Sequence, residues 1–203
     1  MKFEERLKIW KARKFSWSQI SSFEYSPEQW FLRYFMGEQG DETEEMRFGK
    51  MIGERLASDP KFLPQVPRLS KFEQPFNIVF KDIPLVGYAD SFCDKTYKIL
   101  YEYKTGVKKW DQKRVDEHGQ IDLYLLMNFV TNKIRPEEMQ VKLVWLPTER
   151  KESGDFKVHI KLVEPIVPQI FNTKRTMADI LKIGAKVIKV RKEMEKYAKQ
   201  KVI

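Results

Sequence analysis

Two carboxylates and one lysine lie close together near the middle of the chain, in an arrangement that could bind a metal ion. Asp90 ends an alternating apolar run, and Glu102 and Lys104 lie in a second run over residues 98–105. The alternation predicts two strands, and the polar residues 94–96 predict the turn between them. Because strand side chains alternate with period two, Glu102 and Lys104 leave the sheet on one face, and a hairpin can bring Asp90 beside them.

The chemistry open to these three residues is metal-assisted hydrolysis. Carboxylate oxygens are the ligands that Mg²⁺ takes from proteins, and substrate phosphate and water can complete its octahedron. A lysine close by can orient or deprotonate the attacking water. An isolated E-x-K is more often a cross-strand ion pair on a solvated face, so the assignment depends on further features of the chain.

Further features come from three short motifs whose order resembles the RecB-like branch of the PD-(D/E)XK nuclease superfamily, which includes AddB-like and CRISPR-adaptation nucleases. That branch has G-x-x-D, then a strand ending in D/E-x-K-T-G, then a helix carrying Q-x-x-x-Y. The motifs here read Gly87-Tyr88-Ala89-Asp90, Glu102-Tyr103-Lys104-Thr105-Gly106 and Gln120-Ile121-Asp122-Leu123-Tyr124. The resemblance covers about residues 16–147. It implies an α/β domain of the restriction-endonuclease-like class, with a central mixed β-sheet flanked by helices.

The resemblance also implies roles for the residues of the hairpin. Asp90 and Glu102 would hold Mg²⁺, for which Mn²⁺ would substitute, and the Tyr103 carbonyl would be a further ligand. Lys104 would serve the nucleophilic water.

A helix expected over residues 111–131 follows the hairpin directly. Arg114, Glu117, Gln120 and Tyr124 are spaced by three and four, which places them on one helix face. On a lone helix this face would be solvated. After E-x-K-T-G we expect it to face the substrate, with Gln120 and Tyr124 donating to a phosphate or base edge and Arg114 contacting nucleic acid.

The chain departs from the branch at two positions. Members with an iron–sulfur cluster have a ligand cysteine where this chain has Ser26, so we expect no cluster. The histidine of a second motif is replaced by Gly53, in a helix expected over about residues 44–57. The neighbouring Glu54 is predicted to approach the metal as a third carboxylate, and the alternative is a surface ion pair with Lys50.

Composition indicates a single globular domain over residues 1–203. Hydrophobic residues make up 42% and aromatic residues 13% of the chain, which argues against disorder. The lone cysteine, Cys93, excludes an internal disulfide and a cysteine-rich metal site, and we expect it to be buried. No apolar run reaches the length of a membrane span, and the first residues lack the apolar core of a signal peptide, so we expect a cytoplasmic protein without membrane contact.

The net charge of +9 is concentrated at the two ends of the chain. Residues 174–201 hold ten basic and three acidic side chains, and residues 1–15 hold six and two. Such ends suit a phosphate backbone, with Lys189 and Lys192 as predicted contacts, although a solvated helix face is equally compatible with the charge. Apolar residues from 180 to 197 repeat at three and four, which predicts packing against the domain's own sheet or, alternatively, a partner helix.

Several further elements can be predicted. Ser18 is the expected N-cap of a first short helix, and Ser26 that of a second. Beyond the motifs we expect an irregular segment over 60–74, a strand over 76–80, a hairpin with strands at 140–146 and 156–163, and a final helix over about 168–200. His118 and His159 lack paired ligand spacing, so we expect both to be ordinary. The hairpin and the basic final helix together are expected to form the C-terminal region of the domain, residues 156–201, after the core that carries the motifs.

The predicted function is a Mg²⁺-dependent deoxyribonuclease. The resemblance favours an exonuclease acting in DNA recombination, repair or phage DNA processing, with a helicase or recombinase as a conceivable partner. The alternative is a nuclease-derived nucleic-acid-binding or scaffold module without strong catalysis. A third possibility is a coiled-coil adaptor that uses the C-terminal seam, and the sequence leaves the oligomeric state open.

Overall fold

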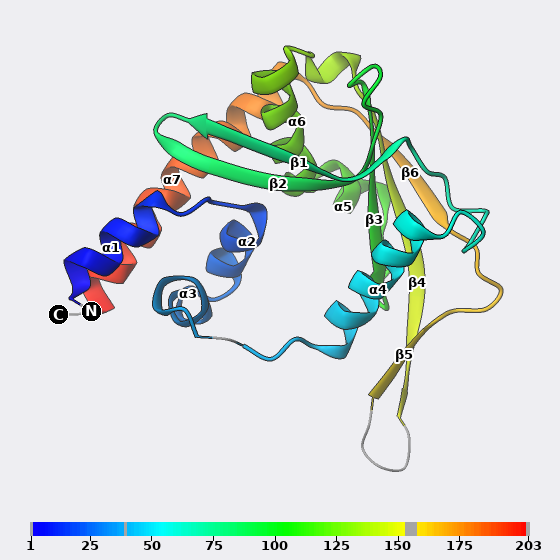
Figure 1. The fold of residues 1–203 in the computed structure, drawn as a ribbon, viewed down its shortest axis with the longest axis horizontal. Coiled ribbons are helices and arrows are strands. Elements are labelled where there is room, and N and C mark those ends of the chain that lie inside the picture. Colours follow the sequence, from blue (N-terminus) through cyan, green and yellow to red (C-terminus); the bar gives the residue numbers. More distant parts are fainter. Residues whose placement is uncertain (1, 39, 153–157, 202–203) are drawn as a thin grey trace.

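A mixed six-stranded sheet forms the centre of the protein (Figure 1). The computed structural model describes residues 2–38, 40–152 and 158–201. The strand order is β1-β2-β3-β4-β5, and β6 also pairs with β4. The strands are β1 (Lys71–Phe80), β2 (Ile83–Phe92), β3 (Ile99–Gly106), β4 (Gln140–Glu152), β5 (Val158–Leu162) and β6 (Gln169–Thr173). Helices flank this sheet, so the predicted fold class is confirmed.

The sheet is mixed because β3 and β4 run parallel while their other neighbours are antiparallel. A parallel pair needs a crossover connection, and the helices between β3 and β4 provide it. β1 starts five residues before the expected strand, so the irregular segment before it is shorter than predicted. β4 continues to Glu152, beyond its predicted end, and residues 153–157, including the expected strand start at 156, lie outside the described part.

Three hydrophobic clusters cover the sheet, the third formed by Trp110, Val115, Leu143 and Trp145. The largest one joins β1, β2 and β3 to α6 (Gly119–Asn132) and α7 (Met177–Lys201). The second one places α4 (Glu44–Ser58) against β3 and β4 through Ile52, Leu56, Val144 and Leu146. Glycine lets α4 approach β3 closely, since a Cβ added to Gly49 would lie 3.1 Å from Thr105 Oγ1. The sequence motifs on β2 and β3 are therefore held between α4 and α6.

The N-terminal helices form one end of the molecule, where α1 (Phe3–Ala12) lies alongside α7 (Figure 1). After α1, Phe15 bridges to Leu85 and so extends the β2 edge. The next helix, α2 (Trp17–Tyr25), begins after Ser16, so the predicted N-cap at Ser18 is wrong. The predicted cap at Ser26 is confirmed, because its hydroxyl accepts from Gln29 N at the start of α3 (Pro27–Trp30). The π-helix η1 (Phe31–Met36) follows directly.

The helix expected over 111–131 is two helices, α5 (Gln112–Asp116) and α6. His118 is extended between them, with ψ of 96°. The break brings Gly119 against Trp17, whose ring would lie 2.4 Å from an added Cβ. Arg114 therefore does not share a continuous helix face with Gln120, and that part of the prediction is wrong.

The C-terminal helix is shorter than expected because residues 169–173 form β6 instead. Alternating burial and pairing with β4 outweigh helix formation in this segment. The predicted apolar seam of α7 is buried inside the domain, where Ile180, Ile183 and Val187 join the largest cluster. The seam therefore packs within the chain, mainly against α6 rather than the sheet.

Cys93 lies after β2 and is half-buried rather than buried. Among the helices described, none combines the length and apolar character needed to cross a membrane.

Candidate active site

Strands β2 and β3 separate at the residues that the sequence singles out. They pair only at Ser91 with Tyr101 and at Phe92 with Leu100. One step further, the Tyr103 amide donates 2.7 Å to the Asp90 carboxylate rather than to a backbone carbonyl of β2. The separation leaves room for side chains between the strands. As predicted, the hairpin brings Asp90 beside Glu102.

The carboxyl groups of the half-buried Asp90 and the buried Glu102 lie together at this position. The Glu102 side chain is fully buried, and its Oε2 has no hydrogen-bond partner among the described residues. Burial and the neighbouring Asp90 carboxylate raise the pKa of Glu102 to about 8. Burial also raises the pKa of Asp90, although Lys104 and the Tyr103 amide oppose the rise. A cation close to the pair lowers this penalty, because it favours the charged form of each carboxyl group.

Lys104 is held beside the carboxylates by two acceptors. Its Nζ lies 2.6 Å from Glu102 Oε1 and 2.9 Å from Gln120 Oε1. Burial disfavours the ammonium, but the charges of Glu102 and Asp90 outweigh burial, so the pKa of Lys104 is raised. Lys104 is therefore a cation at neutral pH, able to donate hydrogen bonds but not to accept a proton.

Gln120 and Tyr124 form a hydrogen-bonded chain from Lys104 to β2. The Gln120 amide nitrogen donates 2.7 Å to the Tyr124 hydroxyl, which donates 2.6 Å to the Tyr88 carbonyl oxygen. Tyr124 is only 4% exposed, so its hydroxyl is committed to this internal contact. The contact with nucleic acid expected of these two residues remains a prediction, and the contacts that the structure shows are positioning ones.

The position of Tyr124 explains why residue 87 is a glycine. Gly87 faces the Tyr124 ring, and an added Cβ would lie 2.7 Å from Tyr124 Cε1. Real Cβ atoms do not approach carbon this closely, so the glycine of G-x-x-D admits the ring that supports β2.

A cavity of about 990 Å³ opens beside the carboxylates, between α4 and the sheet. Asp90, Tyr103 and Lys104 line it from the sheet, and Glu54 lines it from α4. The described residues contain no group of three or more histidine, cysteine or acidic side chains close enough to hold one ion. The structure therefore places Glu54 on the cavity wall without joining it to Asp90 and Glu102, and its role as a ligand stays a prediction.

Glu73 is a further acidic residue of this cavity that the sequence analysis missed. The β1–β2 register places it opposite Asp90, between the pairs Phe72–Ser91 and Gln74–Ala89. Its φ of 49° is unusual for a non-glycine residue in a strand. Burial, Asp90 and Glu54 raise the pKa of its carboxyl. Because the strand was expected to start at residue 76, Glu73 fell within a segment predicted to be irregular.

Arg114 lies on the other side of Lys104, on α5. Its guanidinium covers the Trp110 ring at 3.9 Å and donates 3.2 Å to the Lys109 carbonyl oxygen. Its charge acts on both Lys104 and His118. The nucleic-acid contact expected of Arg114 remains a prediction, and the contacts described for its guanidinium are internal to the protein.

His118, expected to be ordinary, is half-buried between two indole rings. Trp110 and Trp17 contact it edge-on, with ring centroids 5.0 and 6.3 Å away. Burial and the cations Lys104 and Arg114 lower the pKa of His118 to about 3, so the imidazole is neutral at pH 7. No sequence spacing marked this residue, because its surroundings come from three separate segments.

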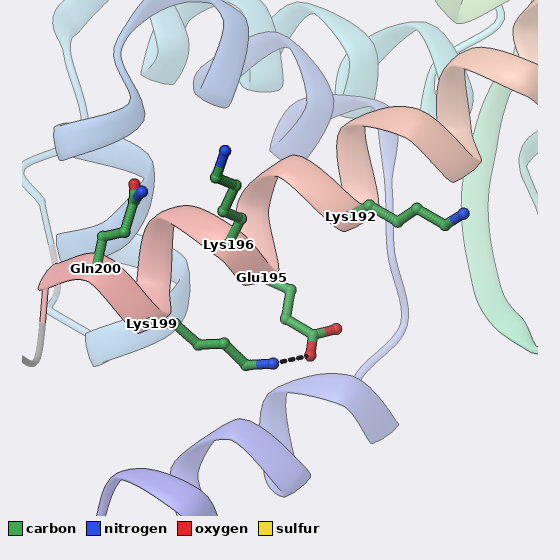
Figure 2. A pocket seen from close by; sticks show the side chains of 5 residues that line it. All are labelled: Lys192, Glu195, Lys196, Lys199 and Gln200. Carbon is green, nitrogen blue, oxygen red and sulfur yellow. Dashed lines mark ion pairs between the residues drawn. The ribbon is translucent and has the colours of Figure 1, made fainter.

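The predicted contacts Lys189 and Lys192 are exposed on α7. The C-terminal part of that helix extends towards α1, away from β3 and α4 (Figure 1). Lys192 borders a shallow hollow with Glu195, Lys196, Lys199 and Gln200 (Figure 2). Glu195 pairs with Lys199 at 2.8 Å and with Lys11 of α1 at 2.7 Å, which neutralises part of the charge. The structure does not bring these lysines together with Asp90 and Glu102.

No family model and no curated relative match the sequence. Among solved structures, a proposed exonuclease from Eubacterium rectale is similar with a TM-score of 0.58 and 9% identity, over 98% of this chain and 85% of the other. LHK-Exo in complex with dAMP aligns with a TM-score of 0.44 and 12% identity, over 97% and 95% of the two chains. A phage-related exonuclease from Haemophilus somnus 129PT gives 0.43 and 12%, over 91% and 80%.

The first of these similarities indicates a common fold. The other two scores are too low to support a statement about this chain. The chain therefore has an α/β fold like that of the Eubacterium rectale protein. Its activity has to be inferred from the residues that lie where β2 and β3 separate.

Proposed function

We propose that the protein is a divalent-metal-dependent nuclease that hydrolyses phosphodiester bonds of DNA. The observation that carries this proposal is the Glu102 Oε2 atom, which is fully buried beside Asp90 and has no described partner. A buried carboxylate oxygen without a donor is costly unless a cation or a proton occupies the position. The lysine at 2.6 Å from the other oxygen supports the same assignment.

The residues present fit a magnesium ion. Asp90 and Glu102 offer hard oxygen donors, and we propose the Tyr103 carbonyl as a further one. When bound, Mg²⁺ would polarise the phosphodiester and lower the pKa of a water molecule, and Mn²⁺ would serve in its place. The proposal includes no iron–sulfur cluster, because Ser26 cannot act as the cysteine ligand.

Lys104 would act on the attacking water as a donor. As an ammonium it would orient the water and stabilise negative charge by donating hydrogen bonds. Gln120 holds the ammonium from the side opposite Glu102, so Lys104 keeps one direction as the substrate arrives. The chain through Tyr124 fixes the same group relative to β2.

The preference for an exonuclease comes from the motif resemblance and from the description of the structurally similar protein. We propose roles in recombination, repair or phage DNA processing on the same basis, with DNA as partner and a helicase or recombinase as a possible second one. No observation on this chain favours an adaptor role for α7, since its apolar seam is buried within the domain.

A substrate panel tests the proposal. Purified protein is incubated with single-stranded, blunt double-stranded and closed circular DNA, each with EDTA, Mg²⁺ or Mn²⁺. A metal-dependent exonuclease degrades the linear DNAs and spares the circle, whereas an endonuclease cuts both. Glu102→Gln serves as the matched control, because it keeps the side-chain shape and removes the charge. Equal loss of DNA with wild-type protein and Glu102→Gln would contradict the proposal, and tight binding without any cleavage would support the scaffold alternative.

Glu54 remains our proposed third carboxylate. Glu54→Gln should raise the Mn²⁺ concentration needed for half-maximal cleavage, because one negative ligand is lost. Glu73→Gln is the comparison, since it lines the same cavity from β1. If only Glu73→Gln shifts the Mn²⁺ concentration needed for half-maximal cleavage, Glu73 rather than Glu54 is the third carboxylate.

A further inference from the structure

Tyr88 exposes its aromatic side chain beside the candidate site. It lies two residues before Asp90 on β2, and 51% of it is exposed. Alternating burial along β2 puts Leu85, Gly87 and Ala89 towards the core, so Tyr88 points to the opposite side. Its cross-strand partner is Pro75, itself exposed, which leaves the ring largely uncovered.

The backbone of Tyr88 is fixed relative to the reacting groups. The Tyr124 hydroxyl holds its carbonyl oxygen, and the same hydroxyl accepts from Gln120, which in turn holds Lys104. Three hydrogen bonds of 2.9 Å or less thus connect the exposed tyrosine with the lysine. A solvent-exposed aromatic on such a fixed segment can bind a flat ligand group with little loss of conformational freedom.

The charge around Tyr88 limits what that ligand group can be. Asp90 and Glu73 lie next to it along the hairpin, and both line the cavity together with Glu54 of α4. These carboxylates disfavour a phosphate at the ring, so a neutral, flat group fits better. A nucleobase has these properties, and every base offers a π-face to a tyrosine.

We propose that Tyr88 is a stacking platform for an unpaired nucleobase of the strand whose phosphodiester lies at Asp90 and Glu102. This inference rests on the proposed nuclease function and adds a substrate requirement to it. A base stacked on Tyr88 is withdrawn from its pair, so the site takes single strands or frayed duplex ends. Stacking alone carries no base identity, so the requirement is independent of sequence.

Fluorescence anisotropy of a labelled oligothymidylate in EDTA tests the platform without cleavage. Tyr88→Ala should weaken binding about 5- to 150-fold, the range for one base–aromatic stack, and Tyr88→Phe should stay close to wild type. Tyr25→Ala is the matched control, because Tyr25 is an 84% exposed tyrosine on α2 rather than on the strand that carries Asp90. Equal affinities for Tyr88→Ala and Tyr25→Ala would overturn the proposal.

A scan with a single abasic nucleotide provides a second readout, because it compares positions of the strand within each protein. Moving the abasic position along the strand should reveal one position at which wild-type protein loses affinity and Tyr88→Ala does not. Equal losses for both proteins at every position would refute stacking at Tyr88 while leaving the nuclease function intact. Absence of nucleic-acid binding and metal-dependent cleavage in wild-type protein would instead refute the proposed function, and Tyr88 with it.

Discussion

Gln120 holds Lys104 through a 2.9 Å hydrogen bond that crosses from α6 to β3. The same side chain donates to Tyr124, so one amide joins the candidate catalytic lysine to the core of the domain. The Q-x-x-x-Y motif therefore has a structural explanation that does not require substrate contact. It fixes the direction in which the ammonium donates.

Replacing Gln120 should affect turnover more than substrate binding. Gln120→Leu removes the acceptor from Lys104 and leaves a charged group with one partner, so we expect kcat to fall by about 10- to 100-fold with little change in KM. Gln120→Glu keeps an acceptor and should recover part of the loss. Steady-state kinetics on linear DNA provides the measurement. A KM increase at unchanged kcat would indicate that Gln120 binds substrate instead.

Two glycines should respond oppositely to alanine. Gly87→Ala places a Cβ 2.7 Å from the Tyr124 ring and should lower the free energy of unfolding by about 1–3 kcal/mol, as overpacking does. Gly53→Ala adds a methyl group to α4 where no atom lies within 4 Å, and should raise it by about 0.5–1 kcal/mol. Urea denaturation measures both. A neutral Gly87→Ala would show that the ring moves aside without cost.

His118 should make the protein sensitive to acid. The pKa of His118 is about 3 in the folded protein and 6.5 in the unfolded chain. Its contribution to the free energy of unfolding is therefore fully present above about pH 6.5 and is lost as the pH falls towards 3. The slope is at most about 1.4 kcal/mol per pH unit for one proton. In His118→Gln this part of the decline should disappear. Urea denaturation of both proteins at pH 7, 6, 5 and 4 checks it, and parallel curves would contradict the assignment.

The basic face of α7 is tested by charge reversal. If Lys189 and Lys192 contact phosphates, the double change to glutamate should weaken DNA binding and reduce the log–log salt slope by about 0.9 for each contact. Lys108 and Lys109, exposed beside α5 and close to Arg114, provide a comparison pair. Unchanged DNA affinity and an unchanged salt slope for the α7 variant would show that this helix face is solvated and does not contact DNA.

The sequence was most informative where local pattern and chemistry coincide. The Asp90–Glu102–Lys104 cluster and α4 could be predicted because they depend on strand alternation and on helix capping within short segments. The break at His118 could not, since it depends on Trp17 packing against Gly119 from a distant part of the chain. Likewise β6 owes its strand conformation to pairing with β4, an interaction that local propensity does not contain.

Side-chain environment was the least predictable property. The internal use of Tyr124, the neutral state of His118 and the position of Glu73 opposite Asp90 all depend on tertiary contacts. Their residue types alone are compatible with surface or substrate-facing roles. The strained φ of Glu73 has no sequence signature, because glutamate rarely adopts it.

Direct Mn²⁺ binding tests the central claim that Asp90 and Glu102 together hold a divalent metal. Titrating the protein with Mn²⁺ and following the free ion by electron paramagnetic resonance measures affinity without substrate or turnover. We predict that Asp90→Asn and Glu102→Gln each weaken binding by at least about 10-fold, while Glu149→Gln, an exposed acidic control on β4, does not. Wild-type Mn²⁺ affinity in folded Asp90→Asn and Glu102→Gln proteins would contradict the account.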